Sequence, residues 1–197
     1  MALERLSIEN VPSTHRVYAA LFRDVSNSAF LQEQLLSRNP EFEYAFLDAS
    51  SIISRIHLLA AIFNAINTQT NDALKTPNVH SEVVLSLSPS NNISEAYRRW
   101  GVTPDKTKGL IAVKIVVTAE EEEEITAKKV WEHLSQHVQG TPIPLSDEEL
   151  SKATDWPKVK KYYKLNGVPV LDKFKDEDLK KKQMQNLILM GMAVRGL

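Results

Sequence analysis

The segment from Ile52 to Ile66 constrains the fold most, because its apolar residues recur with the period of an α-helix. These positions are Ile52, Ile53, Ile56, Leu59, Ala60, Phe63 and Ile66. A helix with an apolar stripe must bury that stripe against another element. We therefore expect a helix that continues to about Asn67 and packs against the rest of the chain.

Four short runs of apolar, β-branched or aromatic residues predict strands at 17–21, 44–47, 83–87 and 109–117. A helix capped near Ser28 and ending near Asn39 is expected after the first run. The polar stretch 68–80 is expected to be a loop. A further helix is predicted from Ile93 to Trp100. Asn92 and Glu95 have the spacing of an N-cap and its N3 partner there, and Gly101 follows at the C′ position.

The second half of the chain favours helices. Apolar residues from Ile125 to Val138 indicate one helix, and Ser146 and Asp155 open two short ones. A last helix is expected from about Asp176 into Val194. We find no internal repeat and no linker that could separate domains. The prediction is a single α+β domain over residues 1–197, with a mixed, mainly antiparallel central sheet of about four strands flanked by several helices.

Composition excludes several kinds of function. The formal net charge is −1, so a nucleic acid could be held only by a local basic patch. The chain has no cysteine, which rules out disulfides and thiolate chemistry. The N-terminus lacks the apolar run of a secretory signal, and no stretch reaches the length of a membrane span. Nucleus and cytoplasm are the expected locations.

No pattern of an enzyme site is present. The six glycines are isolated, so no phosphate-binding loop can be built from them. His133 and His137 have the spacing of a zinc-protease helix, but Leu134 stands where that motif needs glutamate, and two solvated histidines are the preferred interpretation. His57 is interpreted as a half-buried residue bonded to the backbone. We expect no catalytic residue, metal or cofactor.

Three stretches remain, and each has a structural alternative. Residues 86–101 surround a helix start that could hold a phosphate, or are only a well-capped turn. Residues 158–164 carry four lysines and two tyrosines, which suits phosphate contact or a solvated helix face with Val159 turned inward. Residues 184–194 are apolar around nearly the whole helix, so this helix is either buried in its own fold or bound to a partner.

These stretches together resemble the PRPK-binding protein family, called TPRKB in animals, the small outer subunit of the KEOPS/EKC complex. The resemblance rests on residues 42–49, 56–61, 88–96, 100–101 and 192–196, and it covers roughly 14–118 and 176–196. The phrase from Ser88 to Ala96 is the most specific part. The acidic run 120–124 and the region 141–164 lie outside it, so the lysine cluster inherits nothing from the family.

The resemblance implies a subunit that is not an enzyme. Members bind the N-lobe of the atypical kinase/ATPase subunit and stimulate it, which links them indirectly to the threonylcarbamoyl-transferase (OSGEP-like) subunit. The assembly modifies the tRNA adenosine beside the anticodon, and it is also linked to telomere maintenance. Members hold the 3′ CCA tail of tRNA. Combined with residue chemistry, this predicts kinase contact by Met184, Leu187, Ile188, Gly191 and Met192, with Val194 as a weaker candidate. It predicts tRNA contact by Asn91, Asn92, Arg98, Arg99, Lys106 and Lys108.

Two other functions stay open from the sequence alone. One is a stand-alone transferase-like enzyme that uses the region of Asn91 and Arg98 as an anion pocket. The other is an adaptor unrelated to tRNA, in which the C-terminal helix binds some other partner.

Overall fold

The computed structural model describes residues 3–104, 106–117 and 127–194. Its strands are β1 (Leu3–Leu6), β2 (His15–Arg23), β3 (Ala45–Asp48), β4 (Leu110–Val117) and β5 (Thr141–Ile143). The α-helices are α1 (Ser28–Leu36), α2 (Arg55–Thr70), α3 (Val79–Ser86), α4 (Ile93–Trp100), α5 (Ala127–His137), α6 (Asp147–Ala153), α7 (Trp156–Tyr162), α8 (Pro169–Asp172) and α9 (Glu177–Ala193). Two short 3₁₀ helices, η1 (Pro40–Phe42) and η2 (Ala49–Ser51), flank β3.

The central sheet is antiparallel and has the strand order β1-β2-β4-β3. β5 pairs with the last residues of β2, so β1 and β5 lie one after the other along the same edge of that strand. The predicted fold class, an α+β domain with a mainly antiparallel sheet, is confirmed. In the described part of the chain, no helix is long and apolar enough to cross a membrane.

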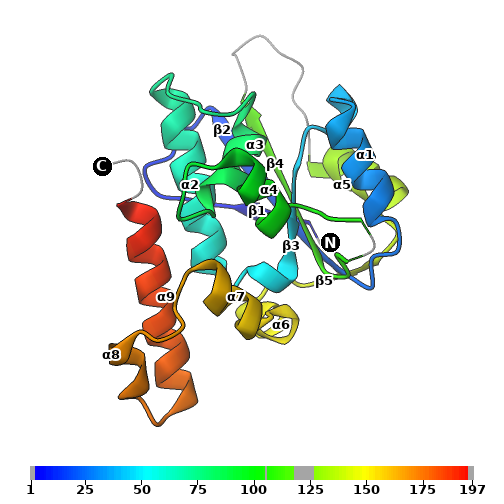
Figure 1. The fold of residues 1–197 in the computed structure, drawn as a ribbon. Helices are drawn as coiled ribbons and strands as arrows, with labels where there is room; N and C mark the ends of the chain where they lie inside the picture. The colour runs from blue at the N-terminus through cyan, green and yellow to red at the C-terminus, as the bar shows by residue number, and fades with distance from the viewer. Residues whose placement is uncertain (1–2, 105, 118–126, 195–197) are drawn as a thin grey trace.

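Both faces of the sheet are covered by helices (Figure 1). In β2, Val17, Ala19 and Leu21 belong to one buried cluster, whereas Tyr18 and Ala20 belong to the other. The first cluster includes buried residues of α2, α3, α4 and α9, and the second includes residues of α1, η1 and α5. The alternation that predicts the strand therefore separates two cores, because successive side chains of a strand point to opposite faces.

The stripe predicted for α2 was partly wrong. The buried residues of the helix are His57, Leu58, Ala61, Ile62, Ala65 and Ile66, whereas Ile56 is 51% exposed. Alanines and the polar His57 carry much of the inward face. Of the predicted positions inside the helix, only Ile66 is among these buried residues, so a count of large apolar residues places the stripe near the opposite side of the helix.

The strand predicted at 83–87 was also wrong, because this run lies in helix α3 and its C-terminal cap. Asn78 caps the helix by accepting a hydrogen bond from the backbone N–H of Ser81 at 2.9 Å. The carboxylate of Glu82 accepts bonds from the backbone N–H of Thr76 and from its hydroxyl, at 3.1 and 2.7 Å. A short apolar run fits a buried helix and a buried strand equally well, and here the cap at Asn78 decides for the helix. The sheet instead gains the short strands β1 and β5, which the sequence analysis missed.

Helix α4 begins as predicted, since the Asn92 side chain accepts a bond from the backbone N–H of Glu95 at 3.0 Å. Gly101 ends it for a different reason from the one expected. Its φ of −73° is not left-handed, but a Cβ there would lie 2.7 Å from the carbonyl oxygen of Tyr97. Close approach of the backbone, and not a left-handed turn, therefore requires glycine at this position.

His57 ties the C-terminal helices to the first half of the chain. The Tyr163 hydroxyl donates to the carbonyl of Leu87 at 2.6 Å, so His57 Nε2 donates to that hydroxyl at 2.8 Å. His57 Nδ1 then accepts from the backbone N–H of Ile53 at 3.4 Å. The backbone bond was predicted, but the ring is completely buried instead of half-buried, and burial lowers its pKa to about 3.

His80 is a second buried histidine. Its Nε2 accepts a bond from the backbone N–H of Ile115 at 3.0 Å. Burial, with the neighbouring Lys114 charge, lowers the pKa of His80 to about 3. Both rings are therefore neutral in the folded chain at any physiological pH.

These two histidines predict a loss of stability in acid. Their folded-state pKa values lie below the ordinary value of 6.5, so only the unfolded chain takes up these protons as the pH falls from about 6.5 towards 3. The free energy of unfolding should fall by up to about 1.4 kcal/mol per histidine and per pH unit in this window. Urea unfolding at pH 7.5 and 5.0 measures it.

The replacement His80→Gln keeps an acceptor for the N–H of Ile115 and should remove close to half of this dependence. Replacement of the less buried His15 by glutamine serves as the control. Equal stability of the unmodified chain at the two pH values would contradict the account.

Candidate binding surfaces

The inward face of helix α9 belongs to the core. Met184, Ile188 and Met192 are spaced four residues apart and are only 1, 1 and 2% exposed. They join the cluster that contains the buried residues of α2. These three residues were predicted to contact a kinase, and the structure corrects that picture, because their side chains are covered by their own chain.

A second apolar stripe of α9 is accessible. Met190 and Val194 are 64 and 59% exposed, and Leu187 and Gly191 are partly exposed on the same side of the helix. A Cβ added to Gly191 would meet no atom within 4 Å, so the fold does not require glycine there. Glycine weakens a helix interior, so its presence here is not explained by the fold. The missing side chain would let another backbone come close to the helix at this position. The sequence showed an all-round apolar helix, and the structure divides it into a core face and an open face. Contact with a kinase stays a prediction.

The start of α4 is largely occupied by its own side chains. Asn92 accepts from the N–H of Glu95, and the side-chain oxygen of Asn91 accepts from Lys75 Nζ at 3.2 Å. Both asparagines are exposed. The cap nevertheless satisfies an N–H group that an anion would otherwise use.

The two arginines of α4 differ sharply. The Arg99 side chain is 22% exposed, with its guanidinium 2.5 Å from Glu95 and 5.0 Å from the centre of the Tyr162 ring. It also donates to the carbonyl of Tyr162 at 3.4 Å. The Arg98 side chain is 74% exposed, and its distance to the Glu95 carboxylate is longer, at 3.9 Å. Arg99 therefore joins α4 to α7, whereas Arg98 is available to a ligand.

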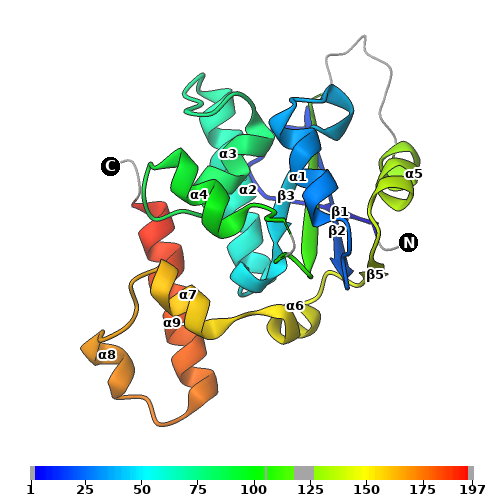
Figure 2. The ribbon, with the colours of Figure 1, turned by 45° about the vertical axis from the view of Figure 1, so that its right-hand side comes forward.

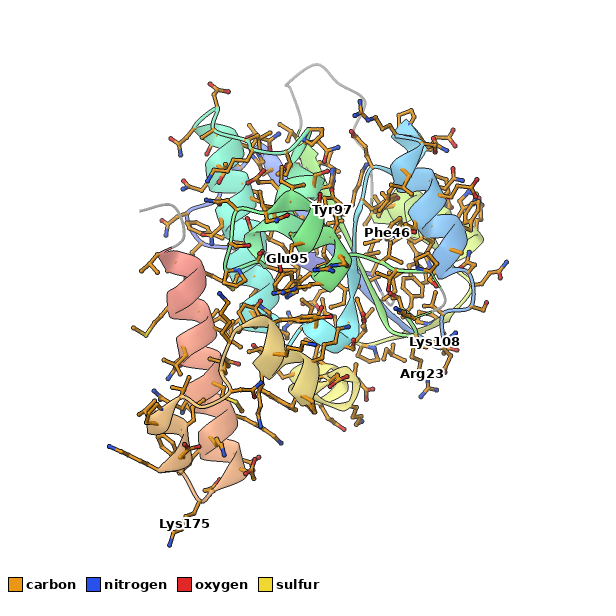
Figure 3. The ribbon with its side chains drawn as sticks, in the orientation of Figure 1. Arg23, Phe46, Glu95, Tyr97, Lys108 and Lys175 are labelled. Carbon is orange, nitrogen blue, oxygen red and sulfur yellow. The ribbon has the colours of Figure 1, made fainter. Side chains whose placement is uncertain are left out.

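Lys106 and Lys108 are exposed but do not extend a patch around the start of α4. The carbonyl of Lys108 accepts from the N–H of Val25, which places this lysine beside the end of β2. Figure 3 shows Lys108 next to Arg23 and well apart from Glu95 and Tyr97. The six predicted tRNA contacts thus do not form one surface. Their roles stay predictions, and the six residues lie in at least two separate places on the surface.

A groove of about 720 Å³ lies beside α4 and was not predicted. Its lining comes from α1, η1, α3, α4 and the residues just before β3. The apolar part includes Leu35, Leu36, Phe42, Tyr44, Val84, Ile93 and Tyr97. Leu36 is 76% exposed in the groove wall. Polar groups on its lining include Gln32, Arg38, Asn78 and Arg98. Of the predicted site residues, only Arg98 lines it.

The groove carries no acid–base pair tuned for neutral pH. Burial raises the pKa of Tyr44 to about 12 and also raises the pKa of Tyr97. Both hydroxyls therefore move away from the range in which a general base works near neutral pH. The partly exposed Tyr97 ring beside Arg98 instead suits the stacking and phosphate contacts that bind an unpaired strand.

The two histidines of α5 were predicted to be solvated, but they pack against other side chains. The rings of His133 and His137 lie 4.6 Å apart, and Tyr44 shares a hydrogen bond of 3.1 Å with His133 Nδ1. Phe42 packs edge-on against both rings. Burial lowers the pKa of His133. Among the described residues, no group of three metal-ligating side chains is present.

In the lysine-rich stretch 158–164, some residues belong to the fold and others are exposed. Val159 is fully buried, as the structural alternative predicts. Lys158 is also committed to the fold, since its Nζ lies 2.6 Å from Asp48 and 2.7 Å from the Ser50 hydroxyl. Lys161 and Lys164 remain exposed.

The fold and its accessible features thus define a small α+β protein with an open apolar helix face and an aromatic groove. A family model described as "Kinase binding protein CGI-121" matches residues 22–196. The chain belongs to this family. The match includes residues 141–164, which carried no part of the resemblance drawn from the sequence.

Curated relatives agree over the whole chain. The EKC/KEOPS complex subunit cgi121 of Neurospora crassa is 58% identical, with 100% of both chains covered. The EKC/KEOPS complex subunit CGI121 of Gibberella zeae is 52% identical, again with 100% of both covered. The corresponding subunit of Schizosaccharomyces pombe is 41% identical over 77% of this chain and 83% of its own.

The two faces of α9 predict different effects of matched substitutions. Ile188→Ala removes a buried side chain and should lower the free energy of unfolding by about 2–5 kcal/mol. Met190→Ala should change it by less than about 0.5 kcal/mol, because the side chain is mainly in solvent. Urea unfolding of both variants measures the contrast. Similar losses in the two variants would show that the helix is oriented differently.

Proposed function

We propose that this protein is a non-catalytic subunit of a KEOPS/EKC complex, which threonylcarbamoylates the tRNA adenosine next to the anticodon. The observation that carries the proposal is the full-length identity to fungal EKC/KEOPS subunits. In this role the protein binds the N-lobe of the kinase/ATPase subunit, stimulates it, and helps to recruit tRNA by its 3′ CCA tail. It acts in the nucleus and cytoplasm, and its link to the OSGEP-like transferase subunit runs through the kinase.

The outer stripe of α9 supplies a surface suited to the kinase. Leu187, Met190, Gly191 and Val194 share one side of the last three turns, which is apolar and lacks charge. Methionine adapts to the shape of a partner, and Gly191 lets a second backbone come close. Since the inner stripe holds the helix on α2, the helix presents the outer one as a fixed platform.

The groove beside α4 supplies a surface suited to a single-stranded RNA end. Tyr97 offers a partly exposed aromatic ring, and Arg98 and Arg38 offer charge for phosphates. This grouping replaces the patch predicted from the sequence and keeps Arg98 as its member. A transferase-like enzyme is less well supported, because burial raises the pKa of both tyrosines that line the groove, further from neutral pH.

The kinase contact is tested by Met190→Arg. A charge in an apolar contact should weaken binding to the kinase subunit at least tenfold without unfolding the protein, because Met190 is exposed. Isothermal titration calorimetry of the kinase subunit with each variant measures the affinity. Ile56→Arg is the matched control, since Ile56 is an exposed apolar residue of α2. Unchanged affinity of the Met190 variant would rule out this face.

The RNA contact is tested by Arg98→Glu. This variant should bind a short single-stranded RNA ending in CCA at least fivefold more weakly, and the affinity of the unmodified protein should fall as salt rises. Arg5→Glu, an equal charge change on an exposed residue of β1, is the control and should bind normally. Equal binding of the Arg98 variant and the unmodified protein would remove the groove from the proposal.

A further inference from the structure

The region from Trp156 to Lys182 forms a lobe that projects from the sheet domain. It contains α7, α8 and the first turns of α9, and Figure 2 shows α8 and the start of α9 extending beyond the layers around the sheet. We call residues 156–182 the lysine lobe.

Charge is concentrated in this lobe. It contains nine lysines and four carboxylates, which gives a net charge of +5, so the remainder of the chain carries −6 of the total of −1. Such a separation of charge produces a local field that the net charge of the molecule hides.

The lysines of the lobe differ from those of the other helices in how they are neutralised. Elsewhere, Lys152 pairs with Glu148 and Glu149 at 2.8 and 2.7 Å, and Lys128 faces Glu132 one turn away at 3.8 Å. In the lobe, five exposed lysines make no ion pair with any described residue, namely Lys161, Lys164, Lys173, Lys175 and Lys182. Figure 3 shows Lys175 pointing outward from the far end of the lobe.

The lobe is joined to the groove through α4. Arg99 contacts both the ring and the carbonyl of Tyr162, and Trp100 lies 5.5 Å from the rings of Tyr162 and Tyr163. The exposed Arg98 precedes Arg99 directly, and Lys161 directly precedes Tyr162. The lobe therefore adjoins α4, the helix that carries Arg98 of the groove.

We propose that the lysine lobe binds the phosphate backbone of the double-helical part of the RNA whose single-stranded end enters the groove. This inference rests on the proposed function and adds a second contact surface to it. Lysine ammonium groups on flexible stems contact phosphates without reading sequence. Tyr162 is engaged by Arg99 and Trp100, so the lobe offers charge instead of a stacking platform. An acidic protein partner would use the same charge, but the contact of the lobe with α4, which also lines the groove, favours RNA.

The experiment compares Lys161→Glu/Lys175→Glu with Arg5→Glu/Arg23→Glu, a control with the same charge change on exposed residues of β1 and β2. Each protein is titrated with three RNAs: an acceptor-stem hairpin ending in CCA, the same hairpin without CCA, and a single-stranded RNA ending in CCA. Thermal unfolding of each variant confirms that it is folded.

The lobe variant should bind both hairpins about tenfold more weakly and the single strand normally. The slope of log affinity against log salt should fall by about two, one for each lost phosphate contact. Normal hairpin binding by the lobe variant would overturn the inference, as would an equal loss in the control.

Two further outcomes are informative. If the lobe variant binds all RNAs normally but no longer binds the kinase subunit, the lobe is a protein-docking surface and the inference is wrong. Failure of the groove is distinguishable, because Arg98→Glu would then bind the single strand normally while the lobe variant still lost hairpin affinity.

Discussion

The packing of α9 on α2 is the interaction on which the rest of the molecule depends. Met184, Ile188 and Met192 complete a core that also contains Leu58, Ile62 and their neighbours, on one face of the sheet. A helix used only for the fold needs one apolar stripe, and α9 has two. The second stripe is accessible, and the proposed kinase contact is placed on it for that reason. The same division between structural and available residues recurs in α4, where Arg99 is held by Glu95 and Tyr162 and Arg98 is largely exposed.

Much of the fold could be predicted from the sequence. β2, β4 and α4 lie where alternation, β-branched residues and the Asn92 cap placed them. The errors have a common cause. The residue types within a segment do not show which other elements pack against it. The apolar run 83–87 is helical because it is enclosed on all sides and capped by Asn78. Alanines and His57 form much of the buried face of α2, so its large apolar residues do not mark that face, and the short edge strands β1 and β5 carry too few residues for a pattern to show.

The binding surfaces could be predicted only in part. The doubled stripe of α9 is visible in the sequence, but which stripe faces outward depends on α2, far away in the chain. The groove is assembled from α1, η1, α3 and α4, and nothing local marks Leu35, Leu36 or Phe42 as its walls. Adjacent arginines look equivalent in a sequence, yet Glu95 and Tyr162 hold one of them and leave the other accessible. A site made by long-range contacts has no short motif.

Amide hydrogen exchange of the whole chain, with and without the kinase subunit, tests the central claim most directly. The account predicts slower exchange on binding in the last turns of α9, around residues 187–194, with the groove beside α4 unchanged. Exchange in α9 that is the same in both states, with protection elsewhere, would contradict the claim that this helix serves both the core and the partner.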